Sequence, residues 1–162
     1  MYLWIAADVS KALCGLRQAA RQCNPGLDET AFSLPQHISL KISFPIADEL
    51  FEQAVEKVTQ LLTNQKPATV AFEGLEIHGD ILWLRADKSM LALHYALDEL
   101  LLNEFNVAPH PFDKNFIFHS TLFIGGPAEK LKVVAKQLTN IPKSAEITEF
   151  IIGPWDRGRP RS

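Results

Sequence analysis

The sequence contains little cysteine, little net charge and no long apolar run. It has two cysteines in 162 residues. Cys14 and Cys23 are too few for a disulfide framework and too far apart for a clustered-cysteine metal site. The formal net charge of −3 excludes an overall basic surface for long nucleic acid. No uninterrupted apolar run approaches the roughly 18 residues of a membrane span. We therefore expect a cytoplasmic protein with reduced thiols and no membrane partner.

The chain also lacks the signals of a leader or of several separate domains. Residues 1–7 are apolar without a basic start, and Asp8 and Lys11 interrupt the run, so no signal peptide is predicted. Hydrophobic residues make up 47% of the sequence and charged residues 22%, as in ordinary globular proteins. No low-complexity linker divides the chain. We expect residues 1–162 to form a single domain, made of two pseudo-symmetric lobes, in a monomeric protein.

Hydrophobic periodicity predicts an alternation of strands and helices. Strands are expected at residues 2–8, 68–77, 81–86 and 145–152, and in two repeated segments that begin at residues 37 and 119. Helices are expected at residues 10–23 and 88–104, and after Pro45 and Pro127. Residues 24–36 and 107–115 are expected to be loops, and the tail 156–162 lacks core-forming residues.

This order of elements fits more than one fold class. Alternation alone would also fit a doubly wound parallel sheet. The turn at residues 78–80 joins two strands as a hairpin, and the internal repeat points to a duplicated half. We therefore expect an α+β, bilobal, duplicated fold, in which two mostly antiparallel sheets with outer helices surround a central cleft.

One stretch of the sequence occurs twice. The first copy, HISLKISFP, begins at His37, and the second, HSTLFIGGP, begins at His119. The copies share His, a hydroxyl residue at +2, Leu at +3, Ile at +5 and Pro at +8. Side chains alternate between the two faces of a strand, so His37 is expected to share a face with Ser39, and His119 with Thr121. The same alternation places Lys41 on the face of His37.

Two imidazole–hydroxyl pairs that face one cleft predict acid–base chemistry on a phosphodiester. An imidazole has a pKa near 6.5 and can donate or accept a proton at neutral pH. One histidine would deprotonate the attacking oxygen, the other would protonate the leaving oxygen, and the hydroxyls would stabilise the phosphate charge. Lys41 is a further phosphate-binding candidate. The arrangement needs no metal or other cofactor, and the sequence offers no third ligand for a zinc site on His37 and His119.

The doubled His-x-[Ser/Thr]-Leu motif resembles the signature of the two-histidine (2H) phosphoesterase superfamily. That superfamily includes 2′-5′ RNA ligase-like proteins and RNA 2′,3′-cyclic phosphodiesterases, and its order of elements matches nearly the whole chain. The resemblance implies hydrolysis of a 2′,3′-cyclic phosphate on a short RNA or a nucleotide, to a 2′-phosphate. It also implies that His37 is the proton donor and His119 the base, with Ser39 and Thr121 on the phosphate. The two motifs are too symmetric for the residues alone to assign these roles.

The chain departs from this family in its basic residues. Many RNA-acting relatives have an arginine soon after the motif, where this chain has Lys41 and residues 123–126 (FIGG), which argues against a long RNA substrate. Three other functions fit the same motif. They are a non-catalytic module that binds nucleotides or RNA ends, an enzyme that joins ends through a 2′,5′ linkage or cleaves another cyclic nucleotide, and a structural protein that keeps only the fold.

The remaining histidines and aromatic residues have simpler interpretations. We expect His78 to belong to the hairpin turn, His94 to a helix surface and His110 to a proline-bounded loop, without catalytic roles. Aromatic side chains are more often core residues than platforms for a nucleobase. We therefore expect Trp83, Phe112 and Phe116 to be core residues.

Overall fold

The computed structural model describes residues 1–23 and 34–154, which build two antiparallel sheets. The three-stranded sheet has the strand order β2 (His37–Pro45), β1 (Tyr2–Asp8) and β7 (Phe150–Pro154). The four-stranded sheet has the order β5 (His119–Ile124), β4 (Ile81–Ala86), β3 (Ala68–His78) and β6 (Ser144–Ile147). The predicted α+β class with two antiparallel sheets is therefore confirmed.

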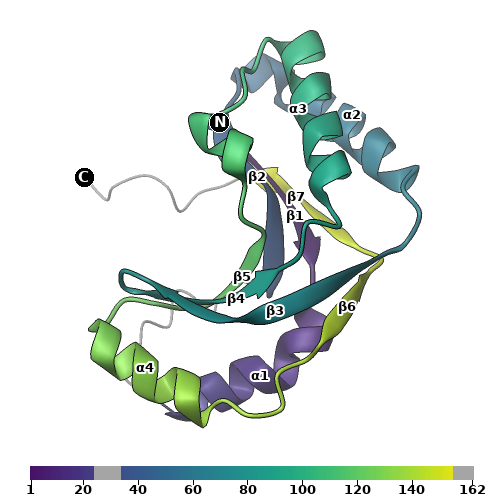
Figure 1. Cartoon of the computed structure of the whole chain (residues 1–162). Coiled ribbons are helices and arrows are strands. Elements are labelled where there is room, and N and C mark those ends of the chain that lie inside the picture. Colours follow the sequence, from purple (N-terminus) through teal and green to yellow (C-terminus); the bar gives the residue numbers. More distant parts are fainter. Residues whose placement is uncertain (24–33, 155–162) are drawn as a thin grey trace.

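The described residues form four α-helices, which cover the outer faces of the sheets (Figure 1). α2 (Phe51–Thr63) and α3 (Leu91–Phe105) pack beside the three-stranded sheet, where α2 contacts β7 and α3 contacts β2. α1 (Ser10–Cys23) and α4 (Ala128–Gln137) contact each other and pack against the four-stranded sheet. Among the described residues, no helix combines the length and the apolar character needed to cross a membrane.

Two of these helices cross from one sheet to the other. α1 follows β1 of the three-stranded sheet but contacts β5 and β6 of the four-stranded sheet, and α3 follows β4 but contacts β2. α1 turns Leu13, Leu16 and Ala20 inward, at the three-to-four-residue spacing of an amphipathic helix. Because each helix buries its apolar face on the opposite sheet, one continuous cluster of buried side chains joins both sheets.

The C-terminal strand prediction was wrong in one respect. Residues 145–152 were expected to form a single strand, but the structure has two strands that belong to different sheets. β6 pairs with β3, and after residues 148–149 the chain continues as β7, which pairs with β1. Burial alternates along β6 but not along β7. The break between the two strands depends on where the two sheets separate, which local periodicity does not encode.

The first motif strand has two register irregularities, and the first of them is a β-bulge at Leu40. Ser39 pairs with Ala6 of β1, whereas Lys41 pairs with the next residue, Ile5, so Leu40 is an extra residue in the ladder. A bulge sets two residues of one strand against one residue of its partner and interrupts the alternation of faces. Leu40 and Lys41 are accordingly both buried. The prediction that Lys41 lies on the same face as His37 was wrong for this reason.

The second motif strand contains a bulge at the same motif position. Thr121 and Phe123 pair with consecutive residues of β4, so Leu122 is the extra residue. Leu122 stands three residues after its histidine, as Leu40 does in the first copy. The repeat in the sequence therefore has a counterpart in backbone geometry, since both motif strands have an extra residue at the motif leucine.

The two motif strands are edge strands, one in each sheet. β2 is at one end of the three-stranded sheet and β5 at one end of the four-stranded sheet. The two strands contact each other, and Figure 1 shows them meeting at the centre of the molecule. The fold thus brings together two segments whose histidines are far apart in the sequence.

Candidate active site

The two motif histidines occupy equivalent positions, and their rings are held in the same way. His37 begins β2 and His119 begins β5. Nδ1 of His37 lies 2.9 Å from the carbonyl oxygen of Pro35, and Nδ1 of His119 lies 2.9 Å from the carbonyl oxygen of Ile117. A carbonyl oxygen only accepts hydrogen bonds, so each Nδ1 carries a hydrogen. The neutral ring then presents the lone pair of Nε2 for proton transfer.

Each catalytic candidate also packs against a tryptophan. Trp4 makes an edge contact with His37, with ring centroids 4.6 Å apart, and Trp83 lies tilted against His119 at 4.1 Å. His78 stacks on the same Trp83 at 4.4 Å. These contacts fix the planes of both imidazoles, which is the preorganisation that a proton-transfer site requires.

Burial lowers the pKa of both histidines, because an imidazolium loses hydration in the interior. For His37, the charges of His119 and Arg17 lower the pKa further. For His119, His78 lowers the pKa and Glu76 raises it. In each case the hydrogen bond from Nδ1 to a carbonyl partly offsets burial. The two motif rings are therefore within electrostatic reach of each other.

A cavity of about 560 Å³ lies where the two motif strands approach each other. Ser39 of the first motif and His119 of the second both line it. Thr121 is half-buried and holds the same motif position as Ser39. His37 is half-buried and contacts Trp4, which lines the cavity. The structure thus brings together the two histidines predicted from the repeat, with one hydroxyl residue of the predicted pair on the cavity wall.

Several lining residues were not expected in the site. Ile42 and Ser43 both line the cavity, because a second register shift of β2 lies between Lys41 and Phe44 and interrupts the alternation there. His78 lines it as well, so the prediction that His78 serves only the hairpin turn was incomplete. Arg17, which acts on His37 from α1, was also missed. Only Arg17 left a signal in the sequence, as one of two arginines four residues apart on the predicted helix.

Aromatic rings form much of the remaining wall. Trp4, Trp83, Phe112 and Phe116 line the cavity. Phe112 is 71% exposed, so its assignment to the core was wrong. Of the described residues that line the cavity, none is Lys, Arg, Asp or Glu. The wall of the cavity is therefore mainly aromatic and apolar, with histidine, serine and asparagine as its polar residues.

Gln36 links the two motif strands through hydrogen bonds of its side chain. Its side chain is buried, and its Nε2 donates to the carbonyl oxygen of Thr121 at 3.2 Å. Its Oε1 accepts a hydrogen bond from the hydroxyl of Ser120 at 3.1 Å. The residue before His37 therefore holds the residues after His119, and the position of one imidazole is tied to that of the other.

Lys41 belongs to a buried charge cluster and does not face the cavity. Its ammonium pairs with Asp98 of α3 and with Asp113 of the short helix η3 (Pro111–Asn115). η3 falls within the predicted loop 107–115, and its buried Asp113 anchors it to β2. Since the ammonium of Lys41 is already held by two carboxylates, we do not assign it to the substrate phosphate.

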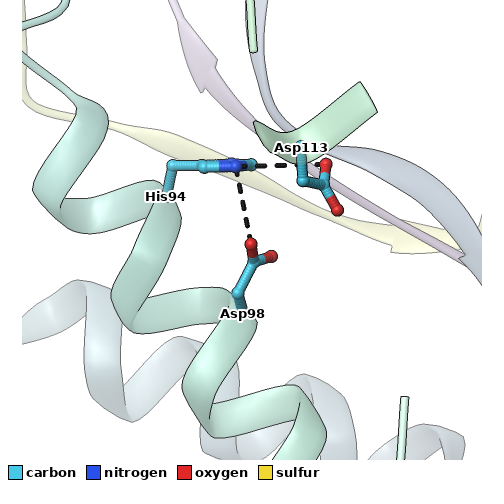
Figure 2. Close-up of side chains that lie close together, drawn as sticks. All are labelled: His94, Asp98 and Asp113. Carbon is cyan, nitrogen blue, oxygen red and sulfur yellow. Dashed lines mark ion pairs between the residues drawn. The ribbon is translucent and has the colours of Figure 1, made fainter. Parts of the chain in front are cut away.

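His94 completes this cluster (Figure 2). It is fully buried, so its predicted place on a helix surface was wrong. Its Nδ1 lies 2.7 Å from the carbonyl oxygen of Leu40. Its Nε2 faces Asp98 at 3.5 Å and Asp113 at 3.9 Å.

The cluster is also the one group of described residues with a geometry that could hold a metal ion. The ligand atoms of His94, Asp98 and Asp113 lie within 4.8 Å of one another. However, Lys41 already supplies a positive charge to both carboxylates. We therefore interpret the group as an ion-pair cluster that joins β2, α3 and η3.

Comparison with known proteins assigns the chain to a family. A family model described as the 2′-5′ RNA ligase superfamily matches residues 8–159, which include both motif histidines. Among curated proteins, none matches the sequence significantly. The family match covers nearly the whole chain and confirms the resemblance carried by the doubled motif. The chain, with one histidine motif on the edge strand of each sheet, belongs to the 2′-5′ RNA ligase superfamily.

Proposed function

We propose that the protein is a metal-independent phosphodiesterase that hydrolyses the 2′,3′-cyclic phosphate of a nucleotide or a short RNA end to a 2′-phosphate. The observation that carries this proposal is the matched pair of Nδ1–carbonyl hydrogen bonds, which leaves Nε2 of both His37 and His119 available for proton transfer. Membership of the superfamily supports phosphoesterase or ligase-type chemistry. Both reactions need one base and one acid.

In the proposed mechanism, His119 is the base and His37 the acid, as the family resemblance implies. Neutral His119 accepts a proton from water at Nε2 while the water oxygen attacks phosphorus. The bond from phosphorus to the 3′ oxygen breaks, and His37, protonated at Nε2, transfers its proton to that oxygen. The product is a 2′-phosphate with a free 3′-hydroxyl, and a proton transfer from His119 to His37 through solvent restores the starting state.

The motif hydroxyls would bind the phosphate. Ser39 lines the cavity, and Thr121 occupies the same position in the second motif. Each hydroxyl would donate a hydrogen bond to a non-bridging oxygen, where negative charge grows in the transition state. The guanidinium of Arg17 acts on His37 electrostatically and would favour an anion on that side of the site.

The proposal predicts a large loss of rate in either histidine variant. His37→Ala and His119→Ala should each lower kcat for a nucleoside 2′,3′-cyclic phosphate roughly 10²- to 10⁴-fold, as expected for loss of a general acid or base. The assay is product formation in the presence of a chelator, with thermal unfolding as a check that the variants are folded. Turnover near the wild-type rate by either variant would refute the mechanism.

A sulfur-substituted substrate would separate the two roles. When sulfur replaces the 3′ oxygen, the leaving thiolate needs no protonation. His37→Ala should then recover most of its rate, whereas His119→Ala should stay slow. The reverse pattern would exchange the two assignments. Recovery in neither variant would contradict a division into one acid and one base.

The description of the matched family favours a second candidate, which is the joining of RNA ends. A 5′-hydroxyl of another RNA would replace water as the attacking group, and the same two histidines would move the protons. The test is to incubate a cyclic-phosphate RNA with a 5′-hydroxyl acceptor and to compare the yields of 2′,5′-joined product and 2′-phosphate. Binding of the substrate with neither product would indicate a non-catalytic module.

A further inference from the structure

Phe112 presents an aromatic ring at the edge of the cavity with little protein around it. Its side chain is 71% exposed, although it lines the same cavity as His119 and Ser39. A single exposed apolar side chain is ordinary on a protein surface. Phe112 differs because it continues a wall of rings that already includes Phe116, and because that wall leads to the paired histidines.

The backbone that carries Phe112 is held firmly from behind. Its N–H donates to Nδ1 of His110 at 3.2 Å, and the N–H of His110 donates to Asp113 at 2.5 Å. Asp113 is buried and paired with Lys41 of the first motif strand. The bulge in β2 places Lys41 in the interior. The ion pair of Lys41 with Asp113 then anchors the short helix η3, which carries Phe112. A ring held in place in advance loses little conformational freedom when a ligand stacks on it.

The chemistry of the wall indicates what would stack there. Apart from histidines, the described lining residues carry no charged side chain, so a flat and uncharged group fits better than a further phosphate. Asn115 lies in the same helix as Phe112 and lines the cavity. Its amide offers both a donor and an acceptor, which is what the edge of a nucleobase requires.

We propose that Phe112 and Phe116, with the amide of Asn115, form a nucleobase subsite that makes the enzyme specific for nucleoside cyclic phosphates over cyclic phosphates without a base. This inference rests on the proposed function and names the substrate class of the same site. A base stacked on Phe112 leaves the ribose and its cyclic phosphate to extend toward Ser39 and His119. Phe112 determines specificity in this scheme and takes no part in proton transfer.

The experiment compares two substrates that share the same reacting group. One is a nucleoside 2′,3′-cyclic monophosphate, and the other is 1-O-methylribose 2,3-cyclic phosphate, which lacks the base. Phe112→Ala should lower the ratio of their kcat/KM values about 5- to 150-fold, the effect expected from loss of one base–aromatic stack. The loss should appear mainly in KM. Phe112→Trp should keep the ratio of the two kcat/KM values near that of the wild type, because the larger ring also stacks on the base.

Tyr95→Ala is the matched control, since it removes a half-exposed ring that lines a different cavity. It should leave the ratio unchanged. A wild-type enzyme that cleaves both substrates equally well, or a ratio that Phe112→Ala does not change, would overturn the subsite while leaving the proposed function intact.

Direct binding separates this inference from a failure of the proposed reaction. If wild-type protein cleaves neither substrate, the proposed function fails, and calorimetry with a nucleoside 2′-monophosphate and with ribose 2-phosphate still tests the subsite. Tighter binding of the nucleotide, lost in Phe112→Ala, would support it. Equal binding of the two ligands would overturn it, as would preferential capture of an apolar peptide at Phe112.

Discussion

Lys41 shows how one residue of a motif strand can serve the fold instead of the reaction. Its ammonium is buried between Asp98 and Asp113 and thereby joins β2 to α3 and η3. A charge is tolerated in the interior only when it is paired, and removing one partner leaves the other charges unpaired. The cluster therefore holds β2, α3 and η3 together, and η3 carries Phe112 and Asn115 at the cavity wall.

Lys41→Met should lower the free energy of unfolding by about 3–5 kcal/mol, because two buried carboxylates lose their common partner. Chemical denaturation of wild type and variant measures the difference. Lys57→Met is the control, since Lys57 pairs with Glu104 at 3.5 Å in an exposed position and should cost less than about 1 kcal/mol. Equal losses in the two variants would contradict the role assigned to the cluster.

At the scale of elements, the contact between β2 and β5 decides the geometry of the site. Both are edge strands, and Gln36 links them through the backbone of Thr121 and the hydroxyl of Ser120. The existence and order of most strands and helices could be predicted, because each has a clear apolar periodicity. The division of residues 144–154 between two sheets could not be predicted, since it depends on which partner each half finds.

The hydrogen bond from the buried hydroxyl of Ser120 to Gln36 contributes to the stability of the contact between β2 and β5. Gln36→Met should destabilise the protein by about 1–3 kcal/mol, because the buried hydroxyl of Ser120 loses its acceptor. Ser120→Ala in the same background should then cost less than it does in wild type, since that hydroxyl is already unpaired. A double-mutant cycle from denaturation curves measures the coupling. Strictly additive losses would show that the two side chains do not act on each other.

In the whole molecule, the two helices that cross between the sheets make the packing of each sheet depend on the other. α1 and α3 each follow a strand of one sheet and pack against the other sheet. The core is continuous across both sheets, so the cavity between the motif strands is framed by a single packed body. His37 and His119 are partly buried in this body. Their protonation therefore affects the free energy of unfolding of the whole protein as well as the proposed chemistry.

This link predicts a loss of stability in acid. Burial lowers the pKa of both His37 and His119, so below the ordinary histidine pKa of about 6.5 the unfolded chain binds protons that the folded protein resists. Their contribution is fully present above that pH and is lost progressively as the pH falls through the folded-state values. The double variant His37→Asn/His119→Asn should show a shallower decrease in the free energy of unfolding between pH 7 and pH 5. Identical slopes would refute the linkage.

The sequence by itself determined the duplicated motif, the residue types that carry the proposed chemistry and the α+β class, because these follow from identity and periodicity along the chain. Only the tertiary structure decided which side of β2 Lys41 occupies, that His94 is buried, and that Phe112 borders the cavity. The physical reason lies in the bulge. The face on which a strand residue lies depends on its register with the partner strand. The extra residue at Leu40 turns Lys41 into the interior, before a second register shift follows between Lys41 and Phe44.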